Sequence, residues 1–314
     1  MPNPFRPALT SGFTLPSATP NPPHPSLQRL LQSALGQLPP SPTLPVAPYW
    51  NAAYFGLDRI RYVRAATPEQ QTQILQKANQ DILEEIYWVE LAGVGYMSKM
   101  SLLAETRQER SLYGLFAADE ATHLSQIQPV LGYEPQFGND GFLCYLEQVL
   151  ESGDRLLLMV LVQVILEGWG LSHYRSLAQA CQVPSLSNLL REFLQAEARH
   201  HALGVTQVKT QLKTQPSYSA QSLTAIEETL RQFLHHVQGG PQRLLTTIEQ
   251  TLGHLSKPQK IHILEDIDTL THSNQRLAIL RSLLTGVIPP ALLQTLSDQG
   301  AFQAYPPELC VEST

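Results

Sequence analysis

The sequence predicts an all-α protein, and three observations support this. From Thr67 onward, apolar residues recur with helical periodicity over long stretches. The alternation of β-branched and polar residues that is typical of strands is nearly absent. Helix-breaking residues, such as Pro184 and the Gly, Pro and Asn residues of segment 132–141, separate the long stretches. We therefore expect helices and no strands.

The chain begins with a Pro-rich segment. Its first 50 residues hold 13 of the 24 prolines, with serine and threonine between them, which is typical of an extended or disordered arm. Only residues 26–38 look helical in this part. We therefore predict an arm over residues 1–66 with one short helix.

The first predicted pair of long helices follows the arm. One helix is expected over residues 68–103, and Thr106-Arg-Gln-Glu109 has the spacing of a capping box for a second helix that ends near Pro129. After the loop at 132–141, a short helix is expected over residues 142–150.

The second predicted pair has the same form. Asp154 is a candidate N-cap for a third long helix over residues 155–180, and Pro184 separates it from a fourth over about 185–213. The four long helices predict a helical bundle over residues 67–215.

The remaining residues, 216–314, predict a C-terminal helical extension. Its expected amphipathic helices are 222–237, 241–254, 258–270 and 274–284. Its histidines are interpreted as solvated or packing residues: His235, His236, His254, His262 and His272. The extension covers the bundle, shapes an entrance or makes a dimer contact, and these alternatives stay open.

Charge and cysteine content exclude several classes of protein. With 21 Lys and Arg against 27 Asp and Glu, the net charge of −6 offers no basic surface, so no nucleic-acid partner is expected. Three distant cysteines without a C-x-x-C pair exclude a disulfide framework, a zinc ribbon and a rubredoxin-type iron centre, and they favour a reducing, cytoplasmic location.

No membrane span or signal peptide is expected. The N-terminus lacks a basic segment followed by a continuous apolar one. The longest apolar run, residues 156–166, is interrupted by Gln163 and is shorter than the roughly 20 residues that a spanning helix needs. We interpret this run as a buried core helix.

A repeated motif of Glu and His residues provides candidate metal ligands. A lone Glu is followed 30 residues later by Glu-x-x-His, and the same phrase then occurs again: Glu90, Glu120, His123, Glu167, Glu197 and His200. Within Glu-x-x-His, the i, i+3 spacing places both side chains on one helical face. The midpoints of the intervals, near Glu105 and Gln182, lie close to the expected turns, so each Glu faces its partner motif across an antiparallel hairpin. We predict that all six groups lie at one level of the bundle and bind two metal ions, with His201 as the i+4 alternative to His200.

The surroundings of the motif favour burial. Val89 and Leu91 are poor neighbours for a solvent-exposed Glu90, which argues against plain surface charges, and buried carboxylates without a partner are costly. Glu84 and Glu85 compete for the first position but point elsewhere around the helix, and only Glu90 fits the 30-residue spacing.

These six residues resemble the ligand set of the ferritin-like di-iron carboxylate superfamily, over residues 75 to 212. The resemblance implies a ferritin-like four-helix bundle, with Glu90 and Glu167 as single ligands and the two Glu-x-x-His motifs as paired ones. It also implies two iron ions, or manganese or a mixed pair, with O2 as co-substrate.

Neighbouring residues refine the resemblance. Asp119 matches an Asp that in many members precedes the Glu of Glu-x-x-His, so it is expected to orient His200 through the other ring nitrogen. Ala196 stands at the equivalent place in the second motif, which makes the two metals inequivalent. Ile127 replaces the tyrosine of radical-generating members, so a stable tyrosyl radical is not expected.

Four glycines follow the single-Glu ligands. Gly93, Gly95, Gly168 and Gly170 each cost a helix about 1 kcal/mol relative to alanine. One hypothesis is a pocket for oxygen and an apolar substrate, formed by Tyr87, Val94, Met97, Phe116, Gly170, Tyr174 and Phe193. Close helix packing explains the glycines equally well, and the interpretation of Tyr174 as a core tyrosine is the favoured one.

Two functions are open on these grounds. In the first, the protein is an O2-dependent non-haem di-iron oxygenase or oxidase that hydroxylates, desaturates or cleaves a small, apolar organic substrate. It would be a monomer or homodimer that takes electrons from an external donor, such as a ferredoxin-type protein. The alternative is a ferroxidase, iron-handling or peroxide-scavenging protein, for which the long C-terminal extension and the cysteine pattern are unfavourable.

Overall fold

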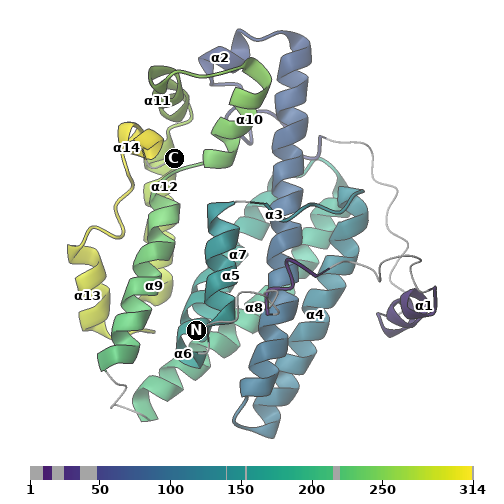
Figure 1. The fold of residues 1–314 in the computed structure, drawn as a ribbon, viewed down its shortest axis with the longest axis vertical. Helices are drawn as coiled ribbons and strands as arrows, with labels where there is room; N and C mark the ends of the chain where they lie inside the picture. Colours follow the sequence, from purple (N-terminus) through teal and green to yellow (C-terminus); the bar gives the residue numbers. More distant parts are fainter. Residues whose placement is uncertain are drawn as a thin grey trace. The chain divides into compact units, whose positions relative to one another are not determined.

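The computed structural model describes residues 10–15, 25–35, 48–138, 140–152, 154–214 and 220–312. Every regular element in these ranges is a helix, which confirms the all-α prediction (Figure 1). The described residues fall into two compact units. Unit 1 comprises those within Met1–Val46 and Ile82–Arg155, and unit 2 those within Ala47–Asp81 and Leu156–Thr314. The predicted domain boundaries at residues 66 and 215 stay predictions.

Unit 1 is built on the helical hairpin of α3 and α4 (Figure 1). Helix α3 spans Pro68–Leu103, as predicted, and its residues from Ile82 onward belong to this unit. Helix α4 spans Arg107–Leu131 and is capped by Thr106, whose side chain accepts a hydrogen bond from Glu109 N at 3.1 Å. The short turn between the helices makes them antiparallel, which is the geometry that the motif spacing requires.

Two further parts of unit 1 pack against this hairpin. Helix α5, Gly141–Glu151, is capped by Asp140. Residues 10–15 lie along α3, where Phe13 is buried against Trp88 and the Thr10 carbonyl occupies the space beside Gly95. This piece of the predicted arm is therefore fixed against the helices.

Helix α1 spans Pro25–Ala34 and accounts for most of the helix predicted at 26–38. Positions 36–38 lie outside the described residues.

The third long helix has the predicted range, but one part of it is not α-helical. It consists of α6 (Arg155–Leu158), a π-helix η1 (Met159–Leu166) and α7 (Glu167–Ala180). At 26 residues it is long and apolar enough to cross a membrane, yet 67% of its most apolar window is buried inside the protein. Burial of this kind is typical of a core helix, in agreement with the interpretation of run 156–166. Helix α8, Pro184–Thr214, packs along η1 and α7.

Every regular element among the described residues of the C-terminal extension is a helix. Its helices are α9 (Ala220–Gln238), α10 (Gln242–Leu252), α11 (Lys257–Asp266), α12 (Thr269–Leu284), α13 (Pro290–Asp298) and α14 (Pro307–Glu312). The first four agree with the predicted helices to within a few residues, whereas α13 and α14 were not predicted. Helix α12 packs on η1 and α7, and α9 packs on η1 and α12. The extension therefore covers the third long helix.

Residues 48–66 do not have the extended structure expected of the arm. Trp50 is fully buried and its indole N–H donates to Leu177 O at 2.9 Å. The side-chain oxygen of Asn79 accepts hydrogen bonds from the backbone N–H groups of Tyr49 and Trp50. The short helix α2, Arg61–Arg64, adds Val63 to a core shared with α10, α11 and α14. Aromatic and aliphatic residues make this segment part of unit 2.

Candidate metal site

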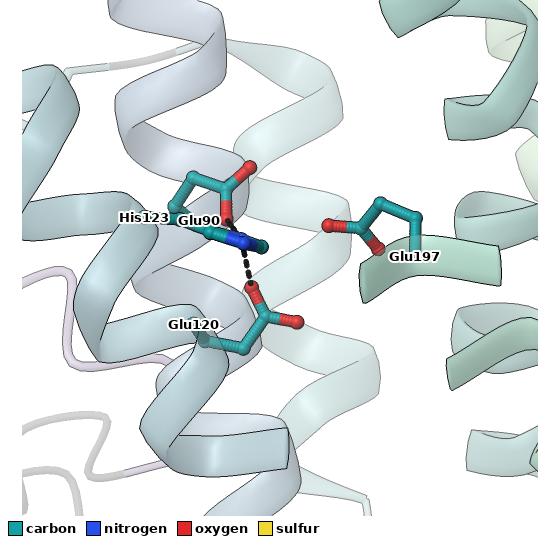
Figure 2. A group of neighbouring side chains, drawn as sticks. All are labelled: Glu90, Glu120, His123 and Glu197. Carbon is teal, nitrogen blue, oxygen red and sulfur yellow. Dashed lines mark hydrogen bonds and ion pairs between the residues drawn. The ribbon is translucent and has the colours of Figure 1, made fainter. Parts of the chain in front are cut away.

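The first half of the predicted ligand set is a buried triad in unit 1. Glu90 on α3 and Glu120 and His123 on α4 are only 1%, 2% and 6% exposed. Atom Nδ1 of His123 lies 3.0 Å from Glu90 Oε2 and 3.6 Å from Glu120 Oε2 (Figure 2). The three side chains offer ligand atoms within 4.8 Å of one another. One metal ion can therefore be reached by all three.

The second half is a buried triad in unit 2 with the same composition. Glu167 begins α7, while Glu197 and His200 lie on α8, and all three are buried. Atom Nδ1 of His200 lies 3.7 Å from Glu167 Oε2 and 3.5 Å from Glu197 Oε2. These ligand atoms also lie within 4.8 Å of one another. In both triads, then, the histidine presents Nδ1 to two carboxylates.

The structure shows which of the alternative side chains lie in the two buried triads. Glu90 is in the first triad, whereas Glu84, one of its competitors, accepts a hydrogen bond from the Tyr133 hydroxyl. In the second triad the ring of His200, not that of His201, faces the carboxylates. The expectation that Val89 is buried was wrong, because its side chain is 38% exposed.

Burial and mutual contact perturb the ionisation of both triads. Burial lowers the pKa of His123, but Glu90 and Glu120 outweigh that effect and raise the pKa to about 10. Burial, reinforced by the neighbouring Glu197, raises the pKa of Glu167 well above its usual value. Both shifts favour the protonated form of the side chain concerned in the metal-free protein.

The donor set fits metal ions. Four carboxylates and two imidazoles are buried, and an unpaired buried carboxylate costs several kcal/mol. Mixed carboxylate and imidazole ligands suit iron and manganese, and two divalent ions would balance the four carboxylate charges. The buried groups of each triad can therefore hold a metal ion. Figure 2 draws the first triad together with Glu197 of the second.

The residues beside the ligands are placed as follows. Asp119 is half-buried on α4, and its expected bond to His200 stays a prediction. Ala196 is buried on α8 and has no side-chain hydrogen-bonding group. Ile127 is fully buried, so an apolar residue occupies the position that a radical tyrosine would take in the superfamily.

Close packing accounts for three of the four glycines. A Cβ at Gly93 would lie 2.8 Å from the carboxylate carbon of Glu120, and one at Gly168 would lie 2.8 Å from the His201 ring. Gly95 faces the Thr10 carbonyl. A Cβ at Gly170 would have no neighbour within 4 Å. Of the four, only Gly170 is left as support for a pocket.

The other proposed pocket residues are mostly buried. In unit 1, Tyr87, Met97 and Phe116 are buried and Val94 is half-buried. In unit 2, Tyr174 and Phe193 pack edge to face with ring centroids 5.8 Å apart. The pocket as a whole stays a prediction.

Sequence reasoning missed Gln163 as part of this region. Gln163 is fully buried in η1, and its side-chain amide donates to the backbone carbonyl of His200 at 3.1 Å. A lone polar residue in an otherwise apolar run was the available signal, because a buried amide needs a partner.

Fold and triads together define the class: an all-helical protein whose buried carboxylate and histidine groups can hold metal ions. Comparisons of the chain with protein-family models, with curated proteins and with solved structures found no match.

Proposed function

We propose that the two triads form one di-metal site in a ferritin-like four-helix bundle of α3, α4, α7 and α8. We further propose that the protein is a non-haem di-iron oxidoreductase that uses O2 to hydroxylate, desaturate or cleave a small, apolar organic substrate. The observation that carries the proposal is the pair of matched buried triads, each with two carboxylates and one imidazole that presents Nδ1.

The sequence spacing supports joining the triads. Each lone Glu precedes its Glu-x-x-His by 30 residues, and each pair is carried by helices joined through a short turn. Two hairpins with the same spacing place their ligands at the same distance from their turns, so they match when packed side by side. Two isolated sites would not require this repetition.

Each ligand residue has a role in the proposal. His123 and His200 would each hold one metal ion, and Glu90, Glu120, Glu167 and Glu197 would chelate or bridge the pair. Asp119 would hold the His200 ring in place. When bound, two iron ions, or manganese in their place, would supply the reduction of O2 with electrons from an external donor, such as a ferredoxin-type protein.

Metal stoichiometry tests the site. Protein loaded anaerobically with Fe(II) and freed of excess metal should retain two ions per chain by elemental analysis. Glu90→Gln and Glu167→Gln should each lower that number, because an amide cannot supply the anionic ligand. Glu84→Gln is the matched control on the same helix and should retain two. Equal retention by all four proteins would refute the site.

Reactivity and size test the function. The iron-loaded protein should consume O2 in the presence of a reductant, and consumption should rise when the organic substrate is added. Mass spectrometry of molecules released on denaturation identifies substrate candidates. A particle of 12 or 24 subunits in size-exclusion chromatography, with O2 consumed only to oxidise Fe(II), would instead support iron storage.

A further inference from the structure

The π-helix η1 ends at Leu166, directly before the proposed ligand Glu167. The backbone N–H of Glu167 donates to Val162 O, five residues back, where an α-helix would use Gln163 O, four residues back. The hydrogen bond that an α-helix would give to the Gln163 carbonyl is thus directed elsewhere.

His201 supplies a hydrogen bond to that carbonyl. Its Nδ1 lies 3.0 Å from Gln163 O, and because a carbonyl oxygen only accepts, Nδ1 must carry the hydrogen. In the reverse direction, the Gln163 side chain donates to the His200 carbonyl at 3.1 Å. Gln163 and the pair His200–His201 therefore hold each other through two hydrogen bonds between η1 and α8.

Two glycines make these contacts sterically possible. The Cβ of Gln163 occupies the space where a side chain at Gly204 would begin. The His201 ring packs against Gly168, where a Cβ would approach it to 2.8 Å. Both glycines lie within four residues of a proposed ligand. The close approach of the helix η1–α7 to α8 therefore occurs beside the second triad.

We infer that Gln163 and His201 form a clamp that positions Glu167 and His200 for metal binding. The inference rests on the proposed function. Both residues act through their neighbours: Gln163 lies one turn before Glu167, and it binds the backbone of His200. Loss of the clamp would release the register between η1 and α8, and the 3.7 Å approach of Glu167 to His200 depends on this register.

A matched pair of variants isolates the hydrogen bond. Asparagine and leucine have nearly the same shape, but only His201→Asn keeps an N–H close to the position of Nδ1. The full chain is titrated anaerobically with Co(II), and the visible absorption of the bound ion reports its ligand geometry. Wild type should bind two ions. His201→Leu should bind the ion of the second triad about 10- to 100-fold more weakly, with an altered spectrum. His201→Asn should restore affinity and spectrum.

The outcomes separate this inference from the proposed function. If wild type binds no Co(II), the proposed function fails. If wild type binds two ions and His201→Leu matches His201→Asn in affinity and spectrum, the clamp alone fails. Gln163→Met, which keeps the volume and removes the amide donor, should weaken the same ion. Failure of both His201→Leu and Gln163→Met to fold, by circular dichroism, would show a folding role and overturn the positioning role.

Discussion

The contact between Gly93 and Glu120 gives a prediction whose magnitude follows from the structure. A Cβ at residue 93 would lie 2.8 Å from both Cδ and Oε2 of Glu120. Ordinary carbon contacts are about 3.5–4.0 Å, so in Gly93→Ala the carboxylate must move by roughly 0.7 Å or more. Metal ligand distances tolerate only about 0.2 Å. The substitution therefore displaces a proposed ligand beyond its working range.

The same substitution should cost the fold little. The displaced atoms are the far end of a flexible side chain, and alanine is favoured over glycine in a helix by about 1 kcal/mol. We expect the melting temperature of metal-free Gly93→Ala to stay close to that of wild type. Affinity for Fe(II) or Co(II) should fall at least about tenfold, which corresponds to about 1.4 kcal/mol.

Anaerobic calorimetric titration measures this loss. Gly114→Ala is the matched control, because a Cβ there meets nothing within 4 Å on the exposed side of α4. The control should be more stable by about 1 kcal/mol and bind metal as wild type does. If Gly93→Ala binds metal with wild-type affinity and stoichiometry, the carboxylate position at Glu120 is not set by the glycine and the reasoning is refuted.

Three further predictions follow from burial and charge. The pKa values of His123 and Glu167 are raised, so the folded metal-free protein binds these protons more tightly than the unfolded chain does. Its free energy of unfolding should therefore fall as pH rises from 6.5 toward 10. Denaturant titrations that show a rise over this range would contradict the prediction. Arg155→Met should destabilise the fold by about 3 kcal/mol, because it leaves the nearly buried Glu109 without its cation; thermal melts would show an unchanged midpoint if the pair were dispensable. Gly170→Leu should block substrate turnover while iron loading stays intact, and unchanged turnover would eliminate the pocket.

The long helices were predictable because their signals are local. The capping residue Thr106 acts within one turn of the backbone, and α3 and α4 begin where such signals predict. The predicted end of α4 near Pro129 was slightly early, because Pro129 lies inside the helix, which continues to Leu131 and is capped by Gly132. The π-helix was not predictable. A π-helix has more residues per turn than an α-helix, so it shifts the positions at which polar residues recur along the sequence. Residues Met159–Ile165 are buried on all sides and have no polar face in which such a shift could be seen. The packing of residues 48–66 was missed because they were grouped with the Pro-rich residues before them, although Pro48 is their only proline.

The same distinction applies to the candidate site. Glu90, Glu120 and His123 could be identified from residue type and spacing alone, since a helix fixes which side chains share a face. The contacts between the helices beside the triads could not be predicted from the sequence. That Gly93 faces Glu120, or that Gln163 meets His200, depends on how far one helix slides along its neighbour. This register is set by packing over many residues and leaves no local pattern.

The perturbations proposed for the two units also test whether the triads form one site. Gly93→Ala acts on the first triad and His201→Leu on the second, and they are carried by different units. Independent sites would give costs in metal-binding free energy that add to within about 0.5 kcal/mol in the double variant. A shared di-metal site, in which carboxylates bridge both ions, should give an interaction term of about 0.5–3 kcal/mol. The double-mutant cycle of Gly93→Ala and His201→Leu is measured on the total free energy of Co(II) binding. A second cycle, with Gly114→Ala in place of Gly93→Ala, is the reference that should be additive. Additivity in both cycles would refute the joined site and leave two separate mononuclear ones.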